Sequence, residues 1–318
     1  MLSLNSVWDW ERQKPLNRFS NGNAIGSRIN EMRLINEDDE ALLMIASSDG
    51  SIKIFQDYES RQTTSLLTAF NSTTRPEAHS MDFSLSMDWL QTRGEILTAG
   101  DSKSIRVWSA HTELLSNVSA KHVYLLRSST NSTSQEIRTL SSTRVTSITS
   151  DQVQGNLICA GFEDGAVRVY DQREHRLKAT VRSWREHNSP ILNLHMQRGG
   201  IRELVSCSQN GTVKLWDALS DTSIHTVRAT QQTAVSFSVH EHAPVFAVGT
   251  SKHKIRVFNT DGETLSTFEP LETVRPQQKR TNPIAAVAFH PHRMMLAASS
   301  REDNFVSLYT CQGLKSLK

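Results

Sequence analysis

The chain of 318 residues lacks the features that define several protein classes. No stretch is apolar over the roughly 18–20 residues that a membrane-spanning helix needs. The start, MLSLNSVWDW, has neither the basic residues nor the apolar run of a signal peptide. The three cysteines (Cys159, Cys207 and Cys311) are odd in number and far apart, so we expect buried, reduced thiols. These absences favour a cytoplasmic protein.

An excess of charge of either sign is also missing. The chain has 35 Lys and Arg against 33 Asp and Glu, a formal net charge of +2. This balance argues against a nucleic-acid partner, which would require a basic surface. The hydrophobic fraction is 37% and the mean hydropathy −0.43, values that suit short, half-exposed strands.

Motifs of catalysis and cofactor binding are absent as well. The sequence contains no GxSxG elbow, no phosphate-binding glycine loop after a strand, no HExxH and no EF-hand loop. Two His-x-His pairs, His240/His242 and His290/His292, could each place two imidazoles on one face of a strand, but no Cys or carboxylate cluster accompanies them. We therefore expect no enzyme activity, no cofactor and no metal.

One pattern is present seven times. A turn is followed by apolar, basic, apolar and aromatic residues, as in SDGSIKIF, DSKSIRVW, EDGAVRVY, QNGTVKLW and SKHKIRVF. EDNFVSLY and LNSVW carry Ser in place of the basic residue. The aromatics are Trp8, Phe55, Trp108, Tyr170, Trp216, Phe258 and Tyr309. Their spacing is close to the length of a WD-type propeller blade, which is about 40–45 residues. Longer loops account for the wider intervals between some copies. Unrelated hairpins in a sandwich would not repeat the same positions.

The most regular copy runs from residue 187 to 217. Apolar and polar residues alternate in LVSCS and in TVKLW, on either side of Asn210-Gly211. This pair takes positive φ at low cost in a hairpin turn. This stretch resembles one WD repeat, with His187, Ser206, Asn210 and Trp216 in the positions of a buried hydrogen-bond network. Asn210 replaces the usual Asp, so its bond to His187 should be weaker than a charge-assisted one. Network positions in other copies are Asp49, Asp164, Ser299 and Asp303.

The predicted fold is all-β: a seven-bladed WD-repeat β-propeller that forms a single domain over residues 1–318. The first blade is incomplete, because no inner strands precede LNSVW, and we expect them upstream of Met1. The Ser/Thr-rich residues 128–143 are predicted to be a flexible loop.

Several longer stretches indicate one particular family among the WD-repeat proteins. SVWDWERQKPLNRFSNGN, GFEDGAVRVYDQR, WREHNSPI and AFHPHRMMLAASS resemble the C-terminal WD domain of the Raptor family. The resemblance implies a non-catalytic scaffold that supports assembly of TOR complex 1 and substrate presentation in nutrient-dependent growth signalling. The implied partners are the TOR kinase complex and upstream Raptor-like domains. The implied location is cytoplasmic, with recruitment to the lysosomal surface as part of a complex, so that the protein would meet a membrane only indirectly.

A second interpretation stays open at this point. A stand-alone WD-repeat adaptor that binds peptides in a ubiquitin ligase or chromatin complex would share the repeats. In either case function should lie in loops, and we select Arg28, Arg185, Lys252 and Arg280 as candidate partner contacts.

Overall fold

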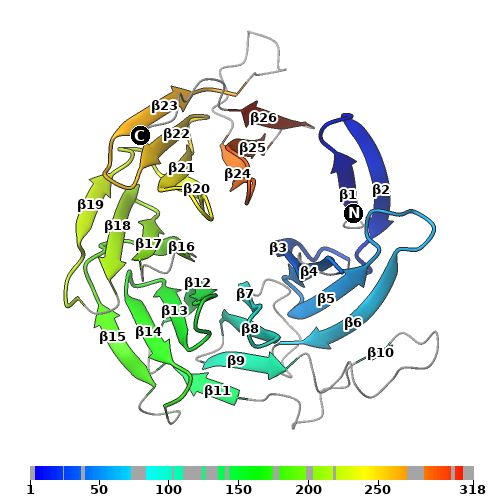
Figure 1. Ribbon diagram of the computed structural model, residues 1–318, viewed down its shortest axis with the longest axis horizontal. Helices are drawn as coiled ribbons and strands as arrows, with labels where there is room; N and C mark the ends of the chain where they lie inside the picture. Colours follow the sequence, from blue (N-terminus) through cyan, green and yellow to red (C-terminus); the bar gives the residue numbers. More distant parts are fainter. Residues whose placement is uncertain are drawn as a thin grey trace. The chain divides into compact units, whose positions relative to one another are not determined.

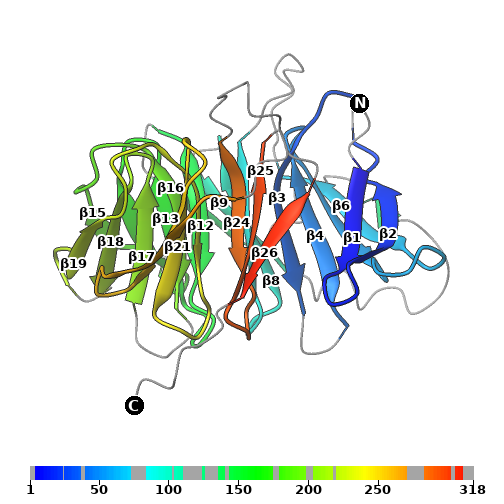
Figure 2. The ribbon, with the colours of Figure 1, turned by 90° about the horizontal axis from the view of Figure 1, so that it is seen from above.

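A computed structural model gives the fold of most of the chain. It describes residues 4–23, 25–36, 40–72, 84–101, 104–109, 124–125, 135–139, 143–174, 179–197, 203–217, 220–270, 283–301 and 305–310. The regular elements of these residues are β-strands (Figures 1 and 2). No helix among them is long and apolar enough to cross a bilayer.

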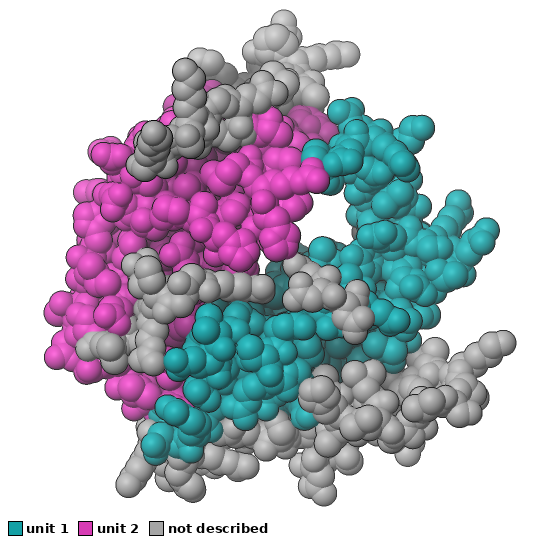
Figure 3. All heavy atoms as spheres, in the orientation of Figure 1, with its two compact units in different colours: residues 1–156, 172–179 teal, residues 157–171, 180–318 magenta. Residues whose placement is uncertain are grey.

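The chain divides into two compact units, coloured separately in Figure 3. Unit 1 comprises Met1–Asn156 and Gln172–Ala179, and unit 2 comprises Leu157–Asp171 and Thr180–Lys318.

Unit 1 contains a hairpin and two sheets of four or more strands. The hairpin pairs β1 (Leu4–Asp9) with β2 (Lys14–Ser20). The first sheet consists of β3 (Ile29–Ile35), β4 (Leu42–Ser47), β5 (Ser51–Gln56), β6 (Ser65–Asn71) and the short parallel β10 (Tyr124–Leu125). The second consists of β7 (Leu85–Leu90), β8 (Glu95–Gly100), β9 (Ser104–Ser109) and β11 (Gln135–Arg138). Strand β12 (Val145–Ser150) also belongs to this unit.

Unit 2 repeats the same antiparallel arrangement. Its strands are β13 (Leu157–Phe162), β14 (Val167–Asp171) and β15 (Thr180–Trp184); β16 (Ile191–Met196), β17 (Glu203–Ser208), β18 (Thr212–Asp217) and β19 (His225–Arg228); β20 (Ala234–Val239), β21 (Val245–Thr250), β22 (Ile255–Asn259) and β23 (Thr264–Phe268); and β24 (Ile284–Phe289), β25 (Met295–Ser300) and β26 (Val306–Thr310). Neighbouring strands follow chain order within each sheet, as expected for propeller blades.

The number of blades differs from the prediction of seven. The described residues form six sheets of three or more strands, and the aromatic of each repeat lies on the third strand: β5, β9, β14, β18, β22 or β26. Trp8 lies on β1, which pairs only with β2, so the first copy is a two-stranded hairpin and not a blade. The described residues therefore form six blades, because none of them pairs with the first aromatic strand as an inner strand.

Part of the predicted flexible loop is a strand. Residues 135–138 form β11, which pairs antiparallel with β9 and completes that sheet. Ile137 is fully buried there, so its apolar side chain offsets the polar composition around it. The rest of 128–143 lies outside the described residues, apart from Thr139 and Thr143.

The hairpin turn of the most regular copy follows from Asn210-Gly211. Gly211 has a φ of 81°, and a Cβ there would lie 2.6 Å from the carbonyl oxygen of Thr230. A glycine is thus required both by the backbone angle and by the close approach of the following loop. The turn directs β17 and β18 so that Val205, Cys207, Val213 and Leu215 join one buried cluster with β20 to β22.

Candidate functional site

The hydrogen-bond network expected from the WD pattern centres on the hydroxyl of Ser206. Ser206 Oγ accepts a bond from Trp216 Nε1 at 2.8 Å and lies 2.7 Å from His187 Nε2. His187 precedes β16, Ser206 lies on β17 and Trp216 on β18, so one hydroxyl joins three consecutive parts of the sheet. All three residues are buried. The structure brings these three side chains together.

Asn210 does not join them. Its Oδ1 accepts bonds from Thr212 N at 2.9 Å and Ser208 Oγ at 2.6 Å, which stabilise the turn locally. His187 Nδ1, the expected partner, is buried and has no hydrogen-bond partner among the described residues. The predicted bond between Asn210 and His187 is therefore absent. A short amide side chain bonds the nearby backbone more readily than a distant ring.

Burial determines the protonation of His187. Desolvation, helped by the nearby Lys214 ammonium and opposed by Glu186, lowers the pKa of His187 to about 4. The imidazole is therefore neutral at physiological pH, so it cannot be the cationic member of an ion pair.

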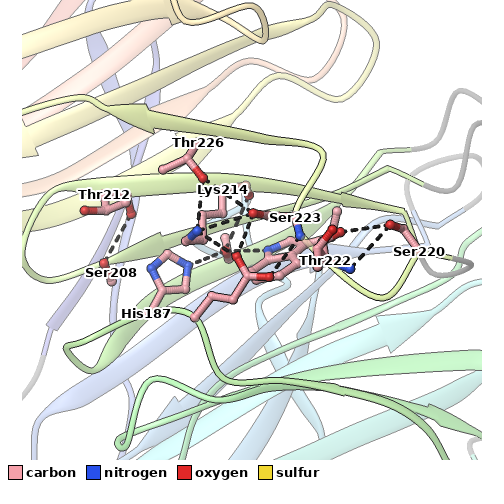
Figure 4. Close-up of polar contacts among 11 residues, drawn as sticks. His187, Ser208, Thr212, Lys214, Ser220, Thr222, Ser223 and Thr226 are labelled. Atoms are coloured by element: carbon pink, nitrogen blue, oxygen red, sulfur yellow. Dashed lines mark hydrogen bonds and ion pairs between the residues drawn. The ribbon is translucent and has the colours of Figure 1, made fainter.

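A buried cation lies beside this network (Figure 4). Lys214 Nζ donates to Glu186 Oε2 at 2.8 Å and to Thr226 Oγ1 at 3.0 Å, and it lies 5.7 Å from the Trp216 ring centre. Glu186 also accepts bonds from the backbone and side chain of Ser223. Partial burial would raise the pKa of Glu186, but bonds from Lys214 and Ser223 outweigh it and leave that pKa lowered. Lys214 on β18 thus holds the loop that enters its sheet before β16.

The same contact recurs in three other sheets. In each, the basic residue two positions before the aromatic bonds to the segment that enters the sheet. Lys53 Nζ donates to Asn21 O and Asn23 Oδ1, both at 2.7 Å. Arg256 donates to Ala229 O at 2.7 Å, and Arg106 donates to Ser72 O. The sequence showed these basic residues as part of the repeat but gave no role for them.

A second version of the hydroxyl network was also missed. Trp108 Nε1 donates to Thr98 Oγ1 at 2.9 Å, and Ser72 Oγ donates to the same atom at 2.8 Å. Thr98 stands ten residues before Trp108, just as Ser206 stands ten before Trp216. That spacing was the signal that could have identified it.

Two of the remaining predicted network residues, Asp49 and Asp164, accept bonds within their own turns. Asp49 Oδ1 accepts from Ser51 N at 3.0 Å, and Asp164 Oδ1 accepts from Ala166 N at 3.1 Å. Ser299 lies half-buried on β25. Asp303 lies outside the described residues.

The predicted contact residues are mostly exposed. Arg28 and Lys252 are exposed in a loop and a turn at the ends of their sheets. Arg185 is also exposed, but its Nη2 donates to Asp164 Oδ2 at 2.6 Å. Arg280 lies outside the described residues. Lys252 belongs to a rigid turn, because His253 has a φ of 59° and its Nε2 lies 3.1 Å from Pro270 O.

Unit 1 contains the most deeply buried carboxylate with an ion-pair partner. Asp88 on β7 pairs through Oδ1 with Arg33 on β3, and its Oδ2 accepts from Ser150 Oγ on β12 at 2.6 Å. Burial raises the pKa of Asp88, although the Arg33 charge opposes this. Both oxygens are engaged, so this group connects inner strands and leaves no free base. The described residues hold no group of three His, Cys, Asp or Glu placed to bind a metal.

The chain is similar to several known proteins in sequence and in fold. A family model described as the nucleolar protein 10-like, N-terminal domain, a β-propeller, matches residues 90–260. Target of rapamycin complex 1 subunit KOG1 of Saccharomyces cerevisiae is 38% identical over 337 residues, covering 96% of this chain and 20% of KOG1. The subunit mip1 of Schizosaccharomyces pombe is 38% identical over 306 residues, covering 96% and 22%. The crystal structure of Chaetomium thermophilum Raptor matches with a TM-score of 0.86 at 43% identity, covering 98% of this chain and 26% of that one.

The chain belongs to the Raptor family. These matches confirm the β-propeller class and the Raptor resemblance predicted from the sequence. The chain spans about a fifth of the length of the curated Raptor-family relatives it matches.

The buried Trp216 supports one prediction. Trp216→Ala should lower the free energy of unfolding by about 3–5 kcal/mol, through a cavity and the lost bond to Ser206. Trp216→Phe keeps most of the volume and should cost less. Urea unfolding of the three proteins measures both effects. Equal stability of wild type and Trp216→Ala would contradict the buried network.

The lowered pKa of His187 supports a second prediction. In the unfolded chain His187 has its ordinary pKa of 6.5 and binds a proton below that pH. In the folded chain its pKa is about 4, so it stays neutral until the pH falls that far. Stability should therefore fall as the pH drops through this window. Between pH 7 and pH 5, wild type should lose about 2 kcal/mol more than His187→Gln, which cannot titrate. Urea unfolding at the two pH values measures the loss for each protein. If wild type and His187→Gln lost the same stability, His187 would not be buried as a neutral ring.

Proposed function

We propose that this chain is the non-catalytic propeller module with which a Raptor-family subunit supports TOR complex 1 assembly and substrate presentation in nutrient-dependent growth signalling. The observation that carries the proposal is 38% identity to two subunits of target of rapamycin complex 1, along 96% of the chain. The proposed partners are TOR kinase and the other domains of the full-length subunit, in the cytoplasm and, through the complex, at the lysosomal surface.

The chemistry of the described residues supports a binding role. The buried ionisable groups Asp88 and Lys214 have ion-pair partners, and His187 is held neutral. Each of them connects strands or loops of its own unit. What such a framework presents to a partner is its exposed loops, the usual place of binding residues.

The proposal includes three finer points. Residues 1–318 act as a single propeller domain, and β1–β2 is the outer half of a seventh blade, because Trp8 matches the third-strand aromatic of the other six copies. Arg28, Arg185 and Lys252 contact the partner, and Lys252 suits this role best because its turn is rigid and its ammonium exposed. The relatives do not favour the alternative, an adaptor of a ubiquitin ligase or chromatin complex.

Co-purification tests the proposal. The full-length subunit that contains this chain should recover TOR kinase from cell extract, and Arg28→Glu combined with Lys252→Glu should reduce the recovery severalfold by charge repulsion. Arg228→Glu, an exposed cation on β19, is the matched control and should change nothing.

The outcomes separate the two levels of the proposal. Failure of the wild-type subunit to recover TOR kinase would overturn the function. Normal recovery with both charge reversals would overturn only the assignment of these contacts.

A further inference from the structure

Four histidines lie together in two turns of unit 2. His240 and His242 belong to the turn after β20, and His290 and His292 belong to the turn after β24. Strands β20 and β24 are the first strands of neighbouring sheets, and both turns lie at the same end of these sheets (Figure 1). Each His-x-His pair thus lies in a turn rather than on one face of a strand.

The first histidine of each pair stabilises its own turn. His240 Nδ1 accepts a bond from His242 N at 3.2 Å. His290 Nδ1 accepts the equivalent bond from His292 N at 3.1 Å. Because Nδ1 of His240 is an acceptor, its Nε2 carries the proton and donates to Arg293 O at 3.3 Å. These bonds fix both turns and connect one turn to the other.

The second histidine of each pair is exposed. The rings of His242 and His292 stack with their centres 5.6 Å apart and their planes at 20°. Among the described residues, no hydrogen bond involves a ring nitrogen of either one. The ring of His290 lies 6.3 Å from that of His292. Two imidazoles with unengaged nitrogens are therefore held side by side on fixed turns.

The spacing of this exposed pair suits one shared metal ion. An imidazole nitrogen lies about 2.0–2.1 Å from a bound zinc ion, so two imidazoles on one ion have ring centres about 5–6 Å apart. The 5.6 Å between the rings of His242 and His292 falls in this range. Exposed side chains change rotamer within nanoseconds, so both rings can turn a nitrogen toward the same ion.

We propose that His242 and His292 together bind a divalent transition-metal ion that prefers nitrogen ligands, Zn²⁺ or Cu²⁺. Two side chains are fewer than the three or four protein ligands of a catalytic or structural zinc site, so water completes the coordination. For the same ligands Cu²⁺ binds more tightly than Zn²⁺. The proposal is independent of TOR complex assembly.

Calorimetric titration of the purified protein with zinc chloride and with copper(II) chloride tests the site. At pH 7 wild type should bind one ion more than the double variant with His242→Gln and His292→Gln. Each single variant should lower the affinity about tenfold or more. His225→Gln, at an exposed histidine on β19 whose ring bonds to Asp261 O at 3.1 Å, is the control and should leave binding unchanged. Equal binding by wild type and the double variant would overturn the proposal.

Thermal unfolding gives a second test, since an ion that binds the folded protein raises the midpoint. Without metal, the double variant should unfold at the wild-type temperature, because both rings are exposed. Zinc should raise the midpoint of wild type and of His225→Gln, but not of the double variant. The rise should be smaller at pH 5, where protons compete for the imidazole nitrogens. An equal rise for wild type and the double variant would place the ion at another site.

Discussion

In each of four sheets, a basic residue on the third strand bonds to the segment that enters the sheet. Strand alternation puts this residue on the same face as the aromatic two positions later. Lys214 and Arg256 accordingly lie 5.7 and 5.6 Å from the ring centres of Trp216 and Phe258. Their aliphatic stems pack on the ring while the charged ends reach the entering loop. The position of each entering loop, and of the residues that the loop exposes, depends on this contact.

The aromatic strands and the Asn210-Gly211 turn were predictable because they rest on local rules, strand alternation and positive φ. The role of Lys214 was not predictable, since its partner Glu186 lies on another segment and the pairing needs the folded sheet.

Asn210 was misassigned because its amide oxygen accepts a hydrogen bond within the nearby turn. Strand β11 was missed because its residues look polar, and only pairing with β9 makes Ile137 a core residue. His253 takes the left-handed angle that glycine takes in the other turns, a substitution that tertiary bonds make tolerable.

Among the described residues, the buried ion pairs stabilise the framework of each unit. Asp88, Lys214 and Ser206 each use their polar atoms to join strands or loops of their own unit. Such a framework keeps loops in place, and loops on a rigid framework are the usual position of binding residues.

A double-mutant cycle on Lys214 and Glu186 tests the central contact most directly. Lys214→Met, Glu186→Gln and the double variant should give a coupling energy of about 1–3 kcal/mol in urea unfolding, because the pair is largely shielded from solvent. The exposed pair Arg182 and Asp221, 2.5 Å apart, should give less than about 1 kcal/mol in the same experiment. A coupling near zero for Lys214 and Glu186 would contradict the account, since the loop would then be held by something else.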